Sequence, residues 1–250
     1  MMRMMTLWVM ACLCCLPLNL LWGQHTTATP ESKVNAIIAG KTFFPDSYYE
    51  TFDWIIFEGW PPANRAIDPN RVDYNLLHAA IFYHTNKVRE AEGLTPFEFS
   101  AELRNSAVFH CTQMIDLSFF SHDNPYQPQF NDMLQRARYF ACEHSTFGEN
   151  IAEEYLCRAD DVRTYWHRRQ PDGSYVFYEG GSQQQGKPIP RHTYNSFAKN
   201  LVTRWLGSPG HRKNLLSTKF TEMGCGVTVD YRTTNTTVIP MAVSTQNFGG

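Results

Sequence analysis

The sequence contains few cysteines and lacks the short motifs of common hydrolases. Residues 24–250 contain four of the seven cysteines, and no two of these have Cys-x-x-Cys spacing. A zinc site built from cysteine pairs is therefore not indicated. The motifs Gly-x-Ser-x-Gly and His-Glu-x-x-His are also absent, which gives no support for a catalytic serine elbow or a zinc-protease helix.

An excess of positive charge is missing as well. When Arg3 is set aside with the N-terminal segment, 21 basic residues face 24 acidic ones, so the remaining chain carries a charge near −3. This balance leaves no electrostatic footprint for nucleic acid or an anionic membrane. No second apolar span exists, so we expect no transmembrane segment in the mature chain. The 43% hydrophobic content is enough for a real core.

Residues 1–23 are typical of an export signal. They contain no acidic residue and a single basic one. The apolar stretch that follows Arg3 is broken only at Thr6, Pro17 and Asn19. We expect cleavage near Gly23 and a mature protein that is secreted, periplasmic or bound to the cell envelope. The alternatives are an uncleaved anchor and a lipoprotein modified at Cys12, although apolar residues continue well beyond that cysteine.

Residues 24–72 form an aromatic-rich extension, and residues 43–60 contain much of its aromatic content. Because aromatic side chains in this number favour burial, we expect this part to pack on the main domain. An exposed aromatic binding patch is the alternative.

Helical spacing begins at Asp73, where Leu77, Ile81, His84 and Val88 share one face up to Gly93. A second helix is expected after Ser100 as N-cap, followed by a short helix over 130–140. A third long helix is expected from the cap Ser196 to Gly207, a glycine suited to positive φ at a helix end. Ser208 then caps a short helix through Leu216, with Pro209 first and His211 in its first turn.

Strand patterns are found in two regions. Met223 to Val229 alternate in character, and Val238 to Thr245 supply a second strand beyond a turn. Residues 158–195 are interpreted as an insertion that contains a hairpin around Pro171–Ser174. The Gly- and Gln-rich tract 180–186 within it is expected to be a mobile loop.

The four remaining cysteines, Cys111, Cys142, Cys157 and Cys225, allow up to two disulfides in an exported protein. Three pairings are possible. Cys142 with Cys157 would close a short loop and leave Cys111 to meet Cys225. Alternatively, Cys111 and Cys225 are small buried hydrophobes on a helix and a strand.

Four ordered stretches carry a family resemblance. They are Asn86–Arg89, Ser121–His122, Gly148-Glu-Asn-Ile-Ala152, and Trp205 to Leu216 with its Ser-Pro-Gly-His-Arg core. Together they resemble the CAP superfamily of cysteine-rich secretory, antigen 5 and pathogenesis-related proteins, in its bacterial SCP-like branch. The resemblance covers about residues 73–250. It implies an α+β fold, a three-layer α-β-α sandwich with a central antiparallel sheet.

The resemblance also implies a cleft shared by two histidines and two acidic residues. His122, Glu149 and His211 match three of these positions, while Ser208 stands where the family has its second glutamate. Two neutral imidazoles and one carboxylate would form an incomplete shell for Zn²⁺ or another divalent cation. The position of His211 at a helix start favours its neutral form.

Each of these residues also has a structural interpretation. Glu149 could hold the turn after Gly148, Asn150 could be a turn residue and Ser208 only a cap. Asn86 and Arg89 are interpreted as surface or structural pairs. His84 and His110, at helical spacing, are expected to be packed partners.

Three function classes follow from these residues and the resemblance. The favoured one is an extracellular or envelope binding module whose cleft, with or without metal, holds a lipid, a peptide or a cell-wall glycan. The second is a metal-assisted hydrolase with Glu149 as candidate catalytic base, weakened by the missing second carboxylate. The third is a structural or adhesion protein whose cleft is vestigial. Fold alone does not choose between them.

Overall fold

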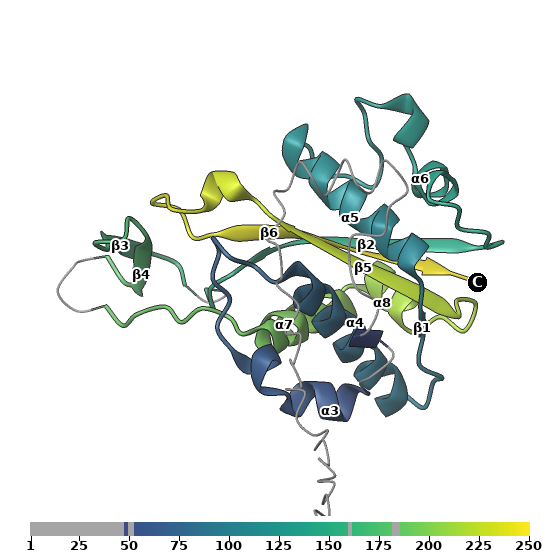
Figure 1. Cartoon of the computed structure of the whole chain (residues 1–250), viewed down its shortest axis with the longest axis horizontal. Helices are drawn as coiled ribbons and strands as arrows, with labels where there is room; N and C mark the ends of the chain where they lie inside the picture. The colour runs from purple at the N-terminus through teal and green to yellow at the C-terminus, as the bar shows by residue number, and fades with distance from the viewer. Residues whose placement is uncertain (1–47, 50–52, 160–161, 182–185) are drawn as a thin grey trace, which may run out of the picture.

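A four-stranded sheet lies between two layers of helices in the computed structural model of this chain (Figure 1). The structure describes residues 48–49, 53–159, 162–181 and 186–250. The strand order is β1-β5-β6-β2, in which β1 runs parallel to β5 and the other neighbours are antiparallel. The strands are β1 (Glu98–Phe99), β2 (Phe147–Tyr155), β5 (Glu222–Val229) and β6 (Met241–Gly249). The predicted three-layer α-β-α sandwich is confirmed, with one short parallel strand added at an edge.

The helices α4 (Tyr74–Ala91) and α7 (Tyr194–Gly207) pack against each other on one face of the sheet. The side chain of Asp73 accepts a hydrogen bond from the Leu76 N–H and so caps α4. Beyond its C-terminus, Gly93 has a φ of +72°, a conformation that costs glycine little. The predicted helix from Asp73 to Gly93 is thus confirmed. Smaller elements on this side are α3 (Trp54–Gly59), η1 (Pro61–Asn64) and α8 (Pro209–Leu215).

The opposite face is covered by α5 (Ala101–Asp116) and, beyond it, α6 (Met133–Tyr139). Ser100 caps α5 as predicted, since its side chain accepts from the Leu103 N–H. The backbone of α5 approaches β5 at two glycines: an added Cβ at Gly226 would lie 2.3 Å from the Val108 nitrogen. Two short 3-10 turns are η2 (Pro128–Phe130) and η3 (Tyr231–Thr233).

The start of α7 differs from the sequence prediction. Its N-cap is Thr193, whose hydroxyl accepts from the Ser196 N–H at 3.1 Å, while the Ser196 hydroxyl accepts from the Thr193 N–H at 2.9 Å. Ser196 is therefore the third helical residue of a reciprocal capping pair rather than the cap. The prediction of positive φ at Gly207 is also wrong. The backbone of Ser208 is extended. Ser208 is the C-cap of α7 and also the N-cap of α8, so no left-handed residue is needed between the two helices.

The segment after Gly148 is a strand and not the turn considered from the sequence. Residues 147–155 form β2, which pairs along its whole length with β6. Because β2 is buried through Asn150 and Ile151, period-two alternation is weak there and the strand is hard to recognise. The last strand, β6, begins at Met241 and continues to Gly249, later than the predicted 238–245.

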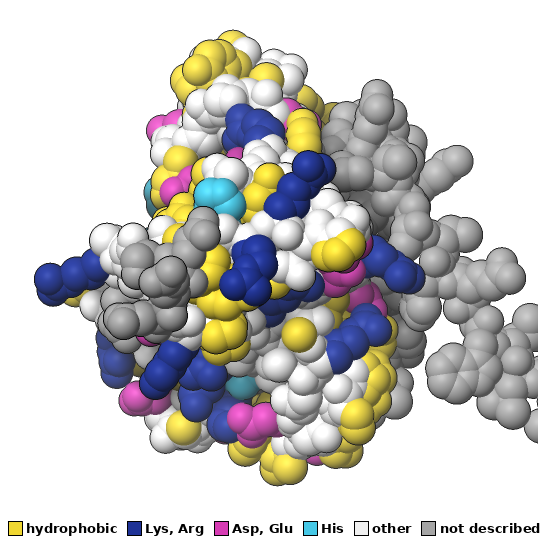
Figure 2. Space-filling model, turned by 90° about the vertical axis from the view of Figure 1, so that its left-hand side faces the viewer, with side chains coloured by type: hydrophobic (Ala, Val, Ile, Leu, Met, Phe, Trp, Pro, Cys, Tyr) yellow, Lys and Arg dark blue, Asp and Glu magenta, His cyan; other side chains and the backbone are white. Residues whose placement is uncertain are grey.

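The predicted hairpin inside 158–195 is confirmed. Strands β3 (Tyr165–Arg169) and β4 (Tyr175–Glu179) form a separate two-stranded sheet around Gly173, which has φ +86°. Lys and Arg side chains are scattered over the face of the molecule on this side (Figure 2). Part of the tract predicted to be mobile, residues 182–185, lies outside the described residues.

The four described cysteines, Cys111, Cys142, Cys157 and Cys225, are all buried and unpaired. Cys111 lies on α5, whereas Cys225 belongs to the core on the other face of the sheet. Cys142 and Cys157 lie in two further separate clusters. The predicted disulfides are therefore not formed, and the alternative of small buried hydrophobes describes Cys111 and Cys225.

The described part of the N-terminal extension contacts the main core. The Phe57 side chain is completely buried and stacks on Tyr83, with ring centroids 4.7 Å apart. Tyr49 stacks on Phe99. The expected signal 1–23 and Cys12 lie outside the described residues. Within the described part of the chain, no helix has the length and apolar character needed to cross a membrane.

Candidate functional site

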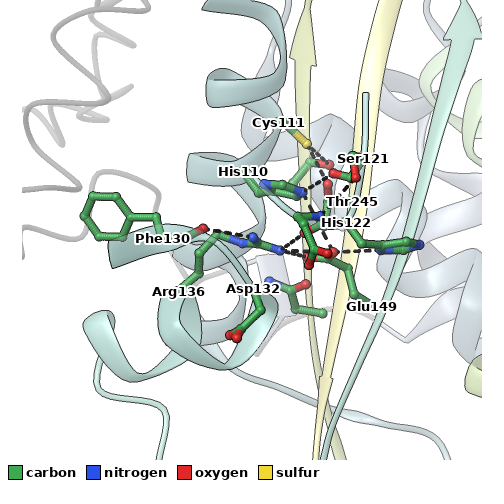
Figure 3. A network of polar contacts seen from close by, with 12 residues as sticks. His110, Cys111, Ser121, His122, Phe130, Asp132, Arg136, Glu149 and Thr245 are labelled. Carbon is green, nitrogen blue, oxygen red and sulfur yellow. Dashed lines mark hydrogen bonds and ion pairs between the residues drawn. The ribbon is translucent and has the colours of Figure 1, made fainter. Parts of the chain in front are cut away.

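The carboxylate of Glu149 is the centre of a buried polar network between β2, α5 and α6 (Figure 3). Its side chain is 4% exposed. Nη2 of Arg136 donates to both of its oxygens, at 3.1 and 2.8 Å. The Arg136 side chain is itself completely buried. The two charges thus form an ion pair that is removed from water.

Arg136 also ties the loop that carries His122 to the rest of the site. From α6, its Nη1 donates to the carbonyls of Phe130 and Asn131, at 3.1 and 2.8 Å. Its Nη2 donates in addition to the His122 carbonyl at 3.0 Å. A planar guanidinium can serve several acceptors in fixed directions. One arginine therefore positions both the carboxylate and the backbone of the histidine loop.

His122 lies at the border between this network and solvent. Its Nδ1 lies 2.9 Å from Glu149 Oε1, and its side chain is 53% exposed. The hydrogen bond to Glu149 raises the pKa of His122, because the carboxylate stabilises the protonated ring. Burial lowers this pKa, but by less. Since Glu149 binds Nδ1, Nε2 is the ring atom left for a ligand.

Two further side chains line the carboxylate from α5 and β6. His110 Nε2 lies 3.0 Å from the Ser121 carbonyl and 3.8 Å from Glu149 Oε1. Burial lowers the pKa of His110 to about 4, so the ring is neutral at pH 7. The hydrogen-bond partners assign the Asn247 amide so that its nitrogen donates to Glu149 Oε2 at 3.1 Å.

His211 approaches from α8 on the other side of β2. It is the third residue of this short helix, as predicted, and its carbonyl accepts from Asn150 Nδ2 at 3.3 Å. Partial burial, and then the nearby charge of His122, lower the pKa of His211. The charge of His122 thus acts on His211. That the two imidazoles share one cleft stays a prediction.

Ser208 belongs to the site less clearly than the sequence suggested. It occupies the N-cap position of α8, but its side chain makes no capping bond. Among the described residues, no hydrogen bond joins it to His122, Glu149 or His211.

The setting of Glu149 does not suit a general base. Burial by itself would raise the pKa of Glu149. The hydrogen bond from His122, the electrostatic interaction with His110 and the charge of Arg136 outweigh burial and lower the pKa. A base poised near neutral pH needs a raised pKa and a free lone pair. Glu149 has a lowered pKa, and both of its oxygens are already hydrogen-bonded.

A zinc shell made of His122, Glu149 and His211 does not fit this arrangement. A divalent cation at Glu149 would have to displace Arg136, a fixed positive charge in hydrogen-bond contact with both oxygens. Within the described ranges, no group of three or more His, Cys, Asp or Glu side chains is placed to hold a metal ion. Zinc binding by the two imidazoles stays a prediction, and it would need the remaining ligands to come from solvent or from a bound molecule.

Arg136 and Asn247 were not among the residues predicted from the sequence, and His110 was predicted only to be a packed partner. A signal for Arg136 existed: its helix has Met133, Ala137 and Phe140 on the same side, and an arginine among apolar neighbours requires a buried partner. Asn150, interpreted as a turn residue, is a buried strand residue that bonds Asn214 at 2.9 Å. Asn86 and Arg89 are buried and structural, which excludes the surface interpretation.

Curated relatives are found among bacterial proteins. Over 142 residues the chain is 27% identical to "Uncharacterized protein YkwD" of Bacillus subtilis (strain 168), which covers 57% of this chain and 38% of that protein. It is 25% identical over 151 residues to "Uncharacterized membrane protein YlbC" of the same organism, which covers 60% of this chain and 31% of the relative. The chain thus spans well under half the length of either relative.

Similar solved structures include an extracellular protein containing an SCP domain from Bacillus anthracis, with 24% identity and a TM-score of 0.46. The match covers 70% of this chain and 41% of that chain. An outer surface protein from Borrelia burgdorferi has 15% identity and a TM-score of 0.42. The match covers 68% of this chain and 88% of that chain. Residues 82–248, more than half of the chain, match the family described as CAP: Cysteine-rich secretory protein family. This chain therefore belongs to the cysteine-rich secretory protein (CAP) family and is of the bacterial SCP-like type.

Proposed function

We propose that this protein is an exported binding module that recognises a peptide or a glycan fragment of the cell wall through the imidazoles of His122 and His211. The observation that carries the proposal is the saturated state of Glu149. Because Arg136 and His122 already occupy both carboxylate oxygens, the carboxylate serves to hold His122 in position. A positioned, half-exposed imidazole is a hydrogen-bonding group for a ligand.

Two exposed aromatic side chains near His122 in the sequence support a ligand with ring or apolar faces. Phe120 is 47% and Tyr126 60% exposed. Tyr and Phe side chains supply contact area at low entropic cost, and the tyrosine hydroxyl adds a polar contact. A hydrogen-bonding imidazole and exposed aromatic side chains in the same stretch of chain favour a peptide or a glycan over a lipid, the third ligand class considered from the sequence.

Calorimetric titration with soluble muropeptides tests the proposal. Wild type should bind without cleaving the probe, and His122→Ala/His211→Ala should bind at least about tenfold more weakly, the effect of removing roughly 1.4 kcal/mol of polar contacts. His167→Ala, on the β3–β4 hairpin, is the control and should bind normally. Equal affinity of the double variant and wild type would remove the histidine site from the proposal.

The metal-assisted hydrolase, the alternative considered from the sequence, is separated from binding by mass spectrometry of the same mixtures. Cleavage that Glu149→Gln abolishes while the fold is retained would favour that alternative. Zinc titration of wild type and of His122→Ala/His211→Ala then tests the metal prediction. Equal stoichiometry in both proteins would show that the two imidazoles are not the zinc site.

A further inference from the structure

A second candidate site lies where α8 and the loop after it meet the start of β2. It is an open groove of about 790 Å³. Its lining includes three cationic and three large apolar side chains: Arg212, Lys213, Lys219, Phe147, Leu216 and Phe220. None of its lining residues is acidic. The groove is thus basic and partly apolar, and it lacks both site imidazoles.

The charge of this groove is not cancelled by neighbouring acids. Among the described residues, Lys213 and Lys219 form no ion pair. Arg212 contacts Glu92 at 3.4 Å, but both side chains are 47% exposed, so water screens this pair strongly. A protein with a slightly negative net charge therefore presents two lysines without an ion-pair partner among the described residues, beside one weakly paired arginine.

The carbonyls at the end of α8 are occupied as well. A helix C-terminus normally presents free carbonyl oxygens and a partial negative charge. Here Arg89 Nη1 donates to the carbonyls of Leu215 and Ser217, at 2.8 and 2.9 Å. Arg89 thereby fixes the loop that forms the groove wall and leaves the local field positive.

The floor of the groove is preformed by aromatic packing. Phe220 stacks on Phe248 with ring centroids 5.6 Å apart. The same ring lies over Gly148, where an added Cβ would be 2.7 Å from the phenyl carbon Cζ. The glycine of the Gly-Glu-Asn stretch is thus required for this floor, and a ligand would not have to open it.

One edge of the groove is the free edge of β2. Thr146 and Gly250 exchange two backbone hydrogen bonds, so the next residue, Phe147, directs its N–H and carbonyl away from β6. The same register applies to every second residue along β2. The outward carbonyls of Glu149, Ile151 and Glu153 accept from Asn214, Trp205 and Arg204 respectively. No described side chain caps the Phe147 carbonyl, which lies where the groove begins.

We propose that this groove binds an extended acidic peptide segment. Its carboxylates would meet Lys213 and Lys219, its apolar side chains would rest on Leu216 and Phe220, and its backbone would pair with Phe147. In an extended peptide successive side chains point to opposite sides, so alternating acidic and apolar residues match this lining. Inorganic phosphate or an anionic lipid would satisfy the cations but would leave the backbone groups of Phe147 unused.

The test uses a fluorescein-labelled decapeptide of alternating glutamate and leucine and follows fluorescence polarisation with the full chain. We expect Lys213→Ala/Lys219→Ala to weaken binding by about tenfold, because two partly exposed ion pairs are lost together. Lys187→Ala/Lys199→Ala removes the same charge from exposed positions elsewhere and should bind as wild type. If both double variants lost the same amount of peptide affinity, the loss would follow from net charge alone, and the proposal would be overturned.

Two further measurements separate a built site from simple charge attraction. A peptide of the same composition with five glutamates followed by five leucines should bind more weakly, and the Phe147 amide should gain hydrogen-exchange protection only with the alternating peptide. Phosphatidylglycerol vesicles or inorganic phosphate that compete at equal charge concentration would instead assign the groove to anions in general. The histidine variant His122→Ala/His211→Ala should keep peptide binding, so this inference and the proposed function can fail independently.

Discussion

At the scale of single residues, the Arg136–Glu149 pair dominates the site. Both side chains are almost fully removed from water, where an unpaired charge is very costly. The pair is accompanied by the hydrogen bonds that a buried ion pair needs, from Arg136 to three backbone carbonyls and to Glu149 from His122. The removal of either partner should therefore cost more than the pair itself contributes.

Arg136→Met should lower the free energy of unfolding by about 3–5 kcal/mol, the usual cost of leaving a buried charge without its partner. Urea denaturation followed by circular dichroism measures this loss. Arg138→Met, on the exposed face of the same helix, should stay within about 0.5 kcal/mol of wild type. The double variant Arg136→Met/Glu149→Gln should be less destabilised than the sum of the single changes. If the losses of unfolding free energy of the two single variants added fully in the double variant, Arg136 and Glu149 would not be energetically coupled.

His110 should make stability depend on pH. Burial lowers its pKa to about 4 from the ordinary 6.5. Between these values the unfolded chain binds a proton that the folded protein does not, so stability falls as pH decreases from 6.5 toward 4, by up to about 3 kcal/mol. His122, whose pKa is raised, acts in the opposite sense, and its contribution is lost as pH rises through its folded-state pKa.

The measurement is urea denaturation of wild type and His110→Gln at intervals from pH 4 to 7. The variant should show a clearly smaller loss of stability over this range, whatever its absolute stability. His167→Gln, on the hairpin, should retain the wild-type slope. An unchanged slope in His110→Gln would show that another group carries the pH dependence.

At the scale of secondary-structure elements, close contact between α5 and β5 depends on two glycines. Added Cβ atoms at Gly224 and Gly226 would lie 1.9 and 2.3 Å from backbone nitrogens of α5. Backbone atoms of a packed helix cannot rotate away as a flexible side chain can. The sheet and this helix layer would have to separate, and the polar contacts around Glu149 extend across that same interface.

Gly226→Ala should therefore reduce the free energy of unfolding by about 3 kcal/mol or more, the upper range for an overpacked core. Thermal and urea denaturation measure the change. Gly207→Ala is the matched control: it lies at the end of α7, no atom lies within 4 Å of its added Cβ, and its φ is not positive. That variant should gain about 0.5–1 kcal/mol from helix propensity.

At the scale of the whole molecule, the described part of the N-terminal extension is continuous with the core. Phe57 belongs to the main hydrophobic cluster together with residues of α4, α7 and β5. Lys87 pairs with Glu58 across the same contact, but this pair is well exposed and contributes little. Burial of apolar side chains thus contributes most of the stability of the contact between the extension and the main domain.

Phe57→Ala should cost about 3–5 kcal/mol, because a fully buried aromatic ring leaves both lost transfer energy and a cavity. Ile55→Ala on the same helix changes a side chain that is 63% exposed and should have little effect. Differential scanning calorimetry compares the two variants with wild type. Similar melting temperatures for all three proteins would mean that the extension does not stabilise the domain.

Local signals predicted most of the elements around the site. The cap at Ser100 and the Ser-Pro start of α8 were visible because capping depends on neighbouring residues. Strand β2 was missed because two of its central buried residues, Glu149 and Asn150, are polar, so apolar and polar residues do not alternate there. The disulfide prediction was wrong because cysteine spacing does not show on which face of the sheet each thiol lies.

By itself, the sequence determined the elements whose signals are local, and the ordered stretches that resemble the CAP family determined the fold and the candidates His122, Glu149 and His211. Only the tertiary structure decided what Glu149 does, because Arg136 reaches it from a helix thirteen residues away and its preference for that carboxylate has no spacing signature. The same holds for the basic groove: α8, the loop after it and the free edge of β2 become neighbours only when the sheet has formed. Contacts between distant segments depend on packing geometry, which the order of residues does not display.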